Sequence, residues 1–138
     1  MPFPPLRTFK DEQEYESYYI TKYCLRPIVT FDNIPVYFHK RDFQHIFFES
    51  VKSKDDTFST DRAERIDWIE YTLKDPNAKL RVGWIGKKKT YDRSRRVAII
   101  AGDYVVIILL NKTQTRANIL TAYVADNSIA KILGSPVW

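Results

Sequence analysis

The chain has little of what metal sites, disulfides and membrane spans are built from. Its 138 residues include one cysteine, Cys24, and two histidines. A single cysteine excludes an internal disulfide and a zinc site with several cysteines, and it fits a reducing cytoplasm. With so few soft ligands we expect no transition-metal site and no cofactor. The longest apolar stretch, residues 104–110, is far shorter than the roughly 20 residues that span a bilayer.

A secretory signal is not expected either, because Met-Pro-Phe-Pro-Pro contains no charged region followed by an apolar one. The length predicts one domain over residues 1–138. The hydrophobic content of 44% is enough for a buried core and excludes disorder as the overall state. We therefore expect a soluble, cytoplasmic domain without a membrane partner.

Aromatic rings and positive charge are what the chain does have. Aromatic residues make up 14% of it, and its net charge is +5. Such a balance favours a polyanionic partner. The charge is concentrated, since eight basic residues and one acidic residue, Asp92, lie between Lys79 and Arg96. Most of the excess charge therefore belongs to one segment.

This segment is typical of a hairpin that contacts the phosphates of RNA, where release of counterions supplies affinity. Trp84 and Tyr91 flank its loop and are candidates for stacking on bases. A solvated turn between two strands is the alternative. The predicted phosphate-binding residues are Lys87, Lys88, Lys89, Arg93, Arg95 and Arg96.

The order of the predicted elements indicates an α+β fold, with helices first and an antiparallel meander afterwards. A capping box at Thr8 starts a helix that runs to Tyr23, with Tyr15, Tyr18 and Tyr19 on its buried stripe. The other predicted elements are a hairpin over residues 28–38, a helix over 41–52 with Val51 on its apolar face, a helix from 59 to 75, strands over 80–86, 97–101, 104–110 and 119–124, and a short last helix.

Two arginines occupy unusual positions in the predicted third helix. Ile66, Ile69 and Leu73 define its apolar stripe, and Arg62 falls within that stripe while Arg65 lies at its edge. Charges seldom face a core without an anionic partner. The partner is either a ligand, such as a phosphate gripped by both guanidiniums, or solvent or an internal carboxylate.

His45 and His39 are the only side chains whose ordinary pKa suits proton transfer near neutrality. His45 lies on the predicted second helix, where Glu49, four residues later, is placed to orient it. A structural role is the alternative for each histidine. Thr121 and Tyr123 share one face of the last strand, either as an ordinary strand pair or facing the histidine and the arginines.

Several short motifs occur in one order along the chain. They are Ile34-Pro35-Val36, Phe43-x-His45, Arg62-x-x-Arg65-Ile66-x-Trp68-Ile69, Tyr104-Val105-Val106-Ile107 and Leu120-Thr121-Ala122-Tyr123. This order resembles a phage- and plasmid-associated branch of the barnase–EndoU–colicin–RelE-like (BECR) ribonuclease superfamily, over residues 8–126. The resemblance implies N-terminal helices packed on a four-stranded antiparallel sheet, and metal-independent cleavage of RNA.

Carried onto this chain, the resemblance places the catalytic site at His45, Arg62, Arg65, Thr121 and Tyr123. The 2′-hydroxyl of RNA is then the nucleophile. His45 acts as general acid or base, the arginines stabilise the phosphorane, Thr121 binds phosphate, and Tyr123 supplies a proton, a hydrogen bond or a stacking face. Expected partners are an RNA such as tRNA and an antitoxin or immunity protein, as for a toxin or a phage effector. The alternatives are a non-catalytic RNA- or DNA-binding module and a virion-associated interaction protein.

Overall fold

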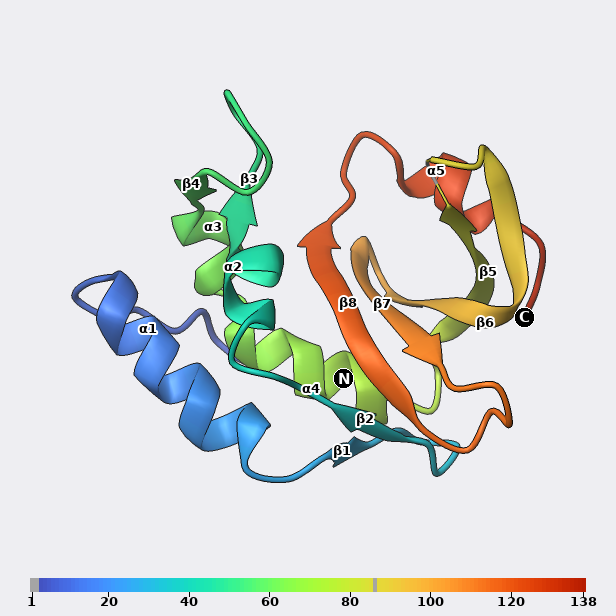
Figure 1. Ribbon diagram of the computed structural model, residues 1–138, viewed down its shortest axis with the longest axis horizontal. Helices are drawn as coiled ribbons and strands as arrows, with labels where there is room; N and C mark the ends of the chain where they lie inside the picture. Colours follow the sequence, from blue (N-terminus) through green and yellow to red (C-terminus); the bar gives the residue numbers. More distant parts are fainter. Residues whose placement is uncertain (1–2, 86) are drawn as a thin grey trace.

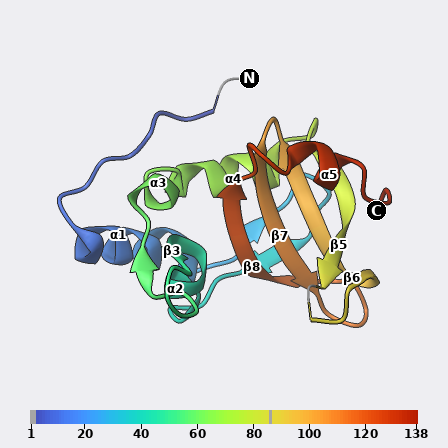
Figure 2. The same cartoon turned by 90° about the horizontal axis from the view of Figure 1, so that it is seen from above.

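The computed structural model describes residues 3–85 and 87–138. A curved sheet forms its centre, with helices packed on both faces (Figures 1 and 2). In chain order the described elements are α1 (Glu12–Tyr19), the π-helix η1 (Ile20–Cys24), β1 (Ile28–Val29), β2 (Pro35–Tyr37), α2 (Asp42–Phe47), β3 (Phe48–Glu49), β4 (Thr57–Phe58), α3 (Thr60–Ala63), α4 (Ile66–Lys74), β5 (Lys79–Ile85), β6 (Thr90–Ala101), β7 (Tyr104–Leu110), β8 (Ala117–Val124) and α5 (Ile129–Leu133). The predicted α+β class is confirmed.

The main sheet is mixed and larger than the four antiparallel strands that were predicted. Its described strands are arranged in the order β1-β2-β8-β7-β6-β5. Strands β5 to β8 are each antiparallel to the next. Strand β2 pairs in parallel with β8, with Val36 opposite Ala117 and Tyr37 opposite Asn118. The hairpin of residues 28–38 thus extends the sheet, because β2 covers part of the edge of β8 that the meander leaves unpaired.

The first helix begins later than predicted, and of its predicted buried tyrosines Tyr18 is only half-buried, with its hydroxyl donating to Asp67. Asp11 is its N-cap, and the Asp11 carboxylate accepts a hydrogen bond from the amide of Glu14. Glu14 in turn accepts a hydrogen bond from the amide of Lys10. The capping interactions therefore lie at Asp11 and Glu14 rather than at Thr8. Tyr15, Tyr19 and Tyr23 are at most 2% exposed.

The second predicted helix is wrong in its C-terminal half. Helix α2 ends at Phe47, because the next two residues pair with Thr57–Phe58 in a short antiparallel ladder. Val51, predicted to lie on a buried face, is 66% exposed. Glu49 consequently lies on a strand and is not the helical neighbour of His45 that was predicted.

The third predicted helix begins as expected and then breaks. Ser59 is the N-cap, and its hydroxyl accepts a hydrogen bond from the amide of Arg62. Helix α3 ends at Ala63, and Arg65 has φ −96° and ψ 19° before α4 begins at Ile66. The apolar stripe of α4 is buried as predicted, with Ile66, Ile69 and Leu73 fully inaccessible. Because of this break, the side chains of Arg62 and Arg65 do not point where they would point on one continuous helix.

The core has two parts, one on each face of the sheet. Helices α1, α2 and α4 pack on the larger part, which includes the aromatic residues of the N-terminal half. Helix α5 covers a smaller cluster around Ala98, Ile100, Val105 and Ala125. The register shift in β8 leaves Leu120 without a partner, so that Ile119 and Ala122 both face the larger core. Among the described residues no helix combines the length and apolarity needed to cross a membrane.

Candidate functional site

Three of the five predicted catalytic residues line one cavity of about 230 Å³. They are Arg62 from α3, Arg65 from the junction of α3 and α4, and Tyr123 near the end of β8. The cavity lies where β7 begins and β8 ends. The parallel strand β2 pairs only with the start of β8, and the helical segment α2–α3 packs beside the rest of that strand.

Arg62 is partly a structural residue. Its Nη1 atom donates to the carbonyl oxygen of Phe48 at 3.2 Å, and the carbonyl oxygen of Ile46 lies 3.5 Å away. The guanidinium carbon is 5.9 Å from the centroid of the Tyr123 ring, within the range of a cation–π contact. Arg62 therefore joins the end of α2 to β8 while its positive charge faces the cavity.

Arg65 is held from two sides and retains an unsatisfied donor. Its Nη1 atom donates to the carbonyl oxygen of Asp61 at 2.6 Å, and its guanidinium lies 5.0 Å from the ring centroid of Trp68. Its Nε is buried and has no hydrogen-bond partner among the described residues. An unpaired buried donor costs about 1–3 kcal/mol, and a ligand or a water molecule that accepts from it would remove this cost. Neither Arg62 nor Arg65 takes part in the ion pairs found in the described parts of the chain.

Two tyrosines complete the inner wall of the cavity. Burial raises the pKa of Tyr123, and the positive charge of Arg62 opposes this rise without cancelling it. Burial likewise raises the pKa of Tyr104, which lies opposite Val124 at the start of β7. Both phenols are therefore neutral near pH 7 and can donate hydrogen bonds. Tyr104 was not predicted as a site residue, although the tight turn at Gly102 and Asp103 places it next to the end of β8.

Three carboxylates on the cavity lining were also missed by the sequence prediction. They are Glu49 on β3, Asp61 on α3 and Asp126 after β8. Glu49 was assigned to the helix of His45, and only the end of α2 at Phe47 brings it to the cavity. A carboxylate beside two arginines supplies the base that cleavage of a phosphodiester requires.

His45 does not line this cavity. Its ring lies on the exposed side of α2, and its Nδ1 is 3.1 Å from a carboxylate oxygen of Asp55 in the loop between β3 and β4. Thr121 is not on the lining either, although it shares a strand face with Tyr123 and pairs with Ile107. The structure thus groups Arg62, Arg65 and Tyr123 and separates His45 from them.

The basic segment forms the hairpin of β5 and β6, as predicted, but β6 begins at Thr90 rather than at Val97. Lys87, Lys88 and Lys89 are exposed at its turn; the neighbouring Gly86 is outside the described residues. Trp84 is 49% exposed and packs edge to face on Tyr91 at 5.0 Å. Arg93 is exposed, with its guanidinium 5.9 Å from the Tyr91 ring. This pair of rings and the three lysines form a surface suited to stacking and phosphate contact.

Arg95 and Arg96 are less free than the rest of the hairpin. The Nε of Arg95 donates to the carbonyl oxygen of Leu110 at 2.8 Å. Arg96 lies across Gly83, where an added Cβ would be 2.1 Å from the Arg96 Cγ. Glycine is therefore required at position 83 if Arg96 keeps its place.

The hairpin and the cavity lie at opposite ends of the sheet. The turn at residues 87–89 precedes the first residue of β6, whereas Tyr104 follows its last residue by a tight turn. In Figure 2 the arrowhead of β8 and the turn between β5 and β6 point away from each other along the strands. A single nucleotide cannot contact both, so an RNA that uses both must extend along the sheet.

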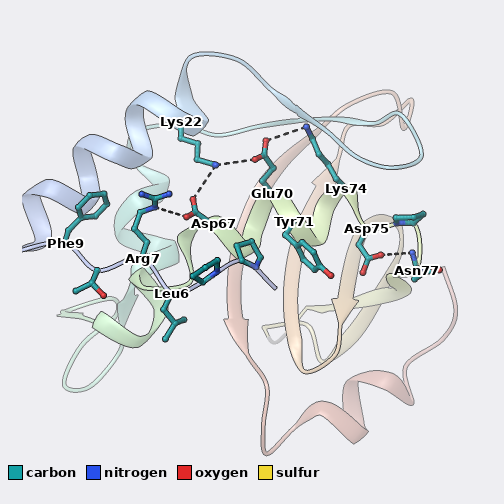
Figure 3. Close-up of a pocket in the computed structure, with 14 residues that line it drawn as sticks. Leu6, Arg7, Phe9, Lys22, Asp67, Glu70, Tyr71, Lys74, Asp75 and Asn77 are labelled. Atoms are coloured by element: carbon teal, nitrogen blue, oxygen red, sulfur yellow. Dashed lines mark hydrogen bonds and ion pairs between the residues drawn. The ribbon is translucent and has the colours of Figure 1, made fainter. Parts of the chain in front are cut away.

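A larger cavity, of about 860 Å³, lies elsewhere, and most of its charged side chains are paired (Figure 3). The N-terminal segment and α4 form its walls. Lys22 bridges Asp67 and Glu70 at 3.4 and 3.3 Å, and Lys74 is 3.6 Å from Glu70. Arg7 binds Asp67 at 2.7 Å. Because these groups satisfy one another, we interpret the cluster as a structural link between the N-terminal segment, η1 and α4.

Replacing Asp67 by asparagine is expected to lower the free energy of unfolding by about 1 kcal/mol at neutral pH, because the link is partly exposed to solvent. Burial by itself raises the pKa of Asp67, but the hydrogen bonds from Tyr18 and Arg7 and the charge of Lys22 outweigh it, so the net pKa is lowered. The stabilisation is therefore present above about pH 4 and is lost as the pH falls further. Urea unfolding at about pH 7 and about pH 3 measures this difference.

In the Asp67→Asn variant the difference in stability from the wild type should shrink on acidification. Glu16→Gln, at an exposed position of α1, is the matched control and should leave both values unchanged. An equal loss of stability at both pH values would contradict a role for the charge of Asp67.

Neither a metal-binding cluster nor a related protein provides an independent indication of what this site does. Within the described residues no group of three His, Cys, Asp or Glu side chains is arranged to hold a metal ion. A search of known protein families, of curated proteins and of solved structures finds no match to this chain.

Proposed function

We propose that the protein is an endoribonuclease that cleaves RNA without a metal ion, in the cavity of Arg62, Arg65, Tyr123 and Glu49. One observation carries the proposal: two arginines that form no ion pair within the described residues converge with two neutral phenols and three carboxylates on one small cavity. A phosphodiester can form the direct charge-assisted hydrogen bonds that the lining carboxylates do not make to the two guanidiniums.

The reaction uses the 2′-hydroxyl of the RNA as nucleophile. Glu49 removes the proton of that hydroxyl, the 2′-oxygen bonds to phosphorus, and the bond from phosphorus to the 5′-oxygen breaks. Tyr123 donates its proton to the leaving oxygen, which is far more basic than a phenolate. Arg62 and Arg65 stabilise the charge of the phosphorane. The products are a 2′,3′-cyclic phosphate and a 5′-hydroxyl.

This assignment differs from the sequence-based one in the choice of base. Glu49 is preferred to His45 because Glu49 lines the cavity, whereas His45 is bound to Asp55 outside it. Thr121 stays a candidate for a contact to the neighbouring phosphate, because it is on the same strand face as Tyr123.

The arrangement of the fold supports the same proposal. The meander of β5 to β8, covered on one face by α1, α2 and α4, agrees with the layout that the BECR resemblance implies. We propose a BECR-like fold to which β1 and β2 are added. A toxin or phage effector of the cytoplasm, with an antitoxin or immunity protein as its partner, fits such an activity.

The test is cleavage of total RNA and of tRNA in EDTA, followed by analysis of the RNA ends. We expect fragments that end in 2′,3′-cyclic phosphate. An oligonucleotide with one 2′-deoxyribose at the cleaved position should bind and resist cleavage there. Arg65→Gln should lower the rate by about 10²-fold, whereas the exposed Arg26→Gln is the matched control. Cleavage that requires a divalent metal, or that persists at the deoxyribose, would refute the proposal.

A non-catalytic RNA-binding module is the second candidate, and the exposed pair Trp84 and Tyr91 beside three lysines favours it. Binding of intact RNA, with no cleavage under any of these conditions, would select this function. If the protein neither binds nor cleaves RNA, the remaining interpretation is a virion-associated interaction protein.

A further inference from the structure

A second charged cavity lies at the other end of β7 and β8. It has a volume of about 310 Å³ and is formed where β7 ends and β8 begins. The cavity proposed for cleavage lies where β7 begins and β8 ends, so the two are separated by the length of these strands. Its basic side chains are Arg95 of β6, Arg116 just before β8, and His39, which follows β2.

Hydrogen bonds hold the side chain of Arg95 and the backbone at Arg116 in place. Arg95 is oriented by the hydrogen bond from its Nε to Leu110. The amides of Arg116 and Thr115 donate to the side-chain oxygen of Asn111, which orders the loop between β7 and β8. Gln114 in that loop donates to the carbonyl oxygen of Ser94 at 2.7 Å. The loop is thereby attached to β6 beside Arg95, and the charges are brought together before any ligand binds.

The lining of this cavity suits an anion that carries a ring. No aspartate or glutamate belongs to the described lining, and none of the ion pairs found in the described residues involves Arg95, Arg116 or His39. Tyr37, which is 36% exposed, supplies an aromatic face. Asn118 contacts the His39 ring, with 3.3 Å between its Oδ1 and the Nε2 atom. Guanidiniums bind phosphate, an aromatic face stacks on a base, and an amide reads base edges.

We infer that this cavity binds a phosphate group and its adjoining nucleotide in single-stranded RNA, at a distance from the bond that is cut. An acidic peptide would also meet the positive charge, but it would leave the aromatic face and the amide unused. The hairpin of Lys87–Lys89 lies at the same end of the sheet. The ligand is therefore an RNA that runs along the strands, and its binding does not depend on whether the protein cleaves it.

Binding of a fluorescently labelled, single-stranded 2′-O-methyl RNA, which cannot be cleaved, tests the inference by anisotropy. Replacing Arg95 and Arg116 by glutamine together should weaken binding at least about tenfold, and the dependence of log Kd on log salt should fall by about 1.4, because two phosphate contacts are lost. Arg116→Gln alone should show about half of the change in slope. Arg116 is exposed and takes part in none of the ion pairs found in the described residues, so this variant should fold normally.

The matched control removes the same charge elsewhere. Lys10→Gln combined with Arg26→Gln, both at exposed positions on the side of α1, should leave the RNA affinity close to that of the wild type. An equal loss of affinity in this control would assign the effect to net charge and overturn the inference. Unchanged binding by the variant of Arg95 and Arg116 would overturn it as well.

Three further measurements separate the ligand classes and the two proposals. If 5′-AMP binds more tightly than the oligonucleotide, or if an acidic peptide displaces the RNA and requires the same arginines, the cavity does not serve RNA. A dinucleoside monophosphate is too short to span the sheet, so the variant of Arg95 and Arg116 should cleave it at the wild-type rate. Loss of RNA binding with unchanged cleavage of the dinucleoside monophosphate supports this binding site. If neither the wild type nor the variant cleaves any RNA, only the proposed function is refuted.

Discussion

Glutamine in place of Glu49 is expected to slow RNA cleavage by about 10²- to 10⁴-fold, because the amide cannot take a proton from the 2′-hydroxyl. Glu49 is exposed on a two-residue strand at the cavity, so the substitution preserves shape and leaves the core untouched. The value of kcat/KM on an RNA with one cleavage site measures the effect. Thermal unfolding of the same preparation should show no change.

His45→Gln is the matched comparison, since it removes the group that the sequence alone favours as acid or base. The His45 ring is engaged with Asp55 and is not on the cavity lining, so this variant should cleave RNA at a rate near that of the wild type. The opposite pattern, with an active Glu49→Gln and an inactive His45→Gln, would show that His45 is the group that transfers the proton.

Truncating Tyr23 to alanine is expected to lower the free energy of unfolding by about 3–5 kcal/mol. The ring is fully buried and lies 4.7 Å from the ring of Phe38. Its hydroxyl donates to the carbonyl oxygen of Ile66 and accepts from the amide of Glu70, so it joins η1 to α4. Since a small domain is stable by only about 5–15 kcal/mol, this one change removes a large share of its stability.

Tyr23→Phe separates the hydroxyl from the ring. It should cost about 1–3 kcal/mol, because the hydrogen bonds of the hydroxyl to the Ile66 carbonyl and the Glu70 amide are lost while the packing of the ring is kept. Urea unfolding monitored by circular dichroism gives both values. The control is Tyr37→Phe, at an exposed phenol. Equal losses for Tyr23→Phe and Tyr23→Ala would contradict the importance of the ring.

The parts of the fold that follow from local spacing were predictable. The recurrence of Tyr15, Tyr19 and Tyr23 encodes a buried helical face directly, and the alternation in the last strands encodes a sheet. The ends of helices were not predictable in the same way. Phe43, Ile46 and Phe47 fit a helix that continues to Val51, and only the pairing of Phe48–Glu49 with Thr57–Phe58 stops it. Such pairing is a tertiary interaction that local propensity does not contain.

The same reasoning explains which site residues were found. Arg62 and Arg65 are three positions apart, and their charge at core-facing positions was visible without the structure. Glu49 was visible only as a partner of His45, because its assignment to a helix gave it the wrong direction. Tyr104 needed the register of β7 against β8, which the sequence does not determine.

The residues that form the walls of the cavity are far apart in the sequence. This separation determines when the cavity forms during synthesis of the protein. The cavity requires residues from Glu49 to Asp126, and β2 finds its parallel partner only in β8. Pairings between segments so far apart form late, after the loop between them has been closed. Arg62 and Arg65 therefore leave the ribosome well before β8, the strand that completes the cavity. Under the proposed function, the messenger RNA that encodes the protein is therefore not exposed to its active nuclease until β8 has been synthesised.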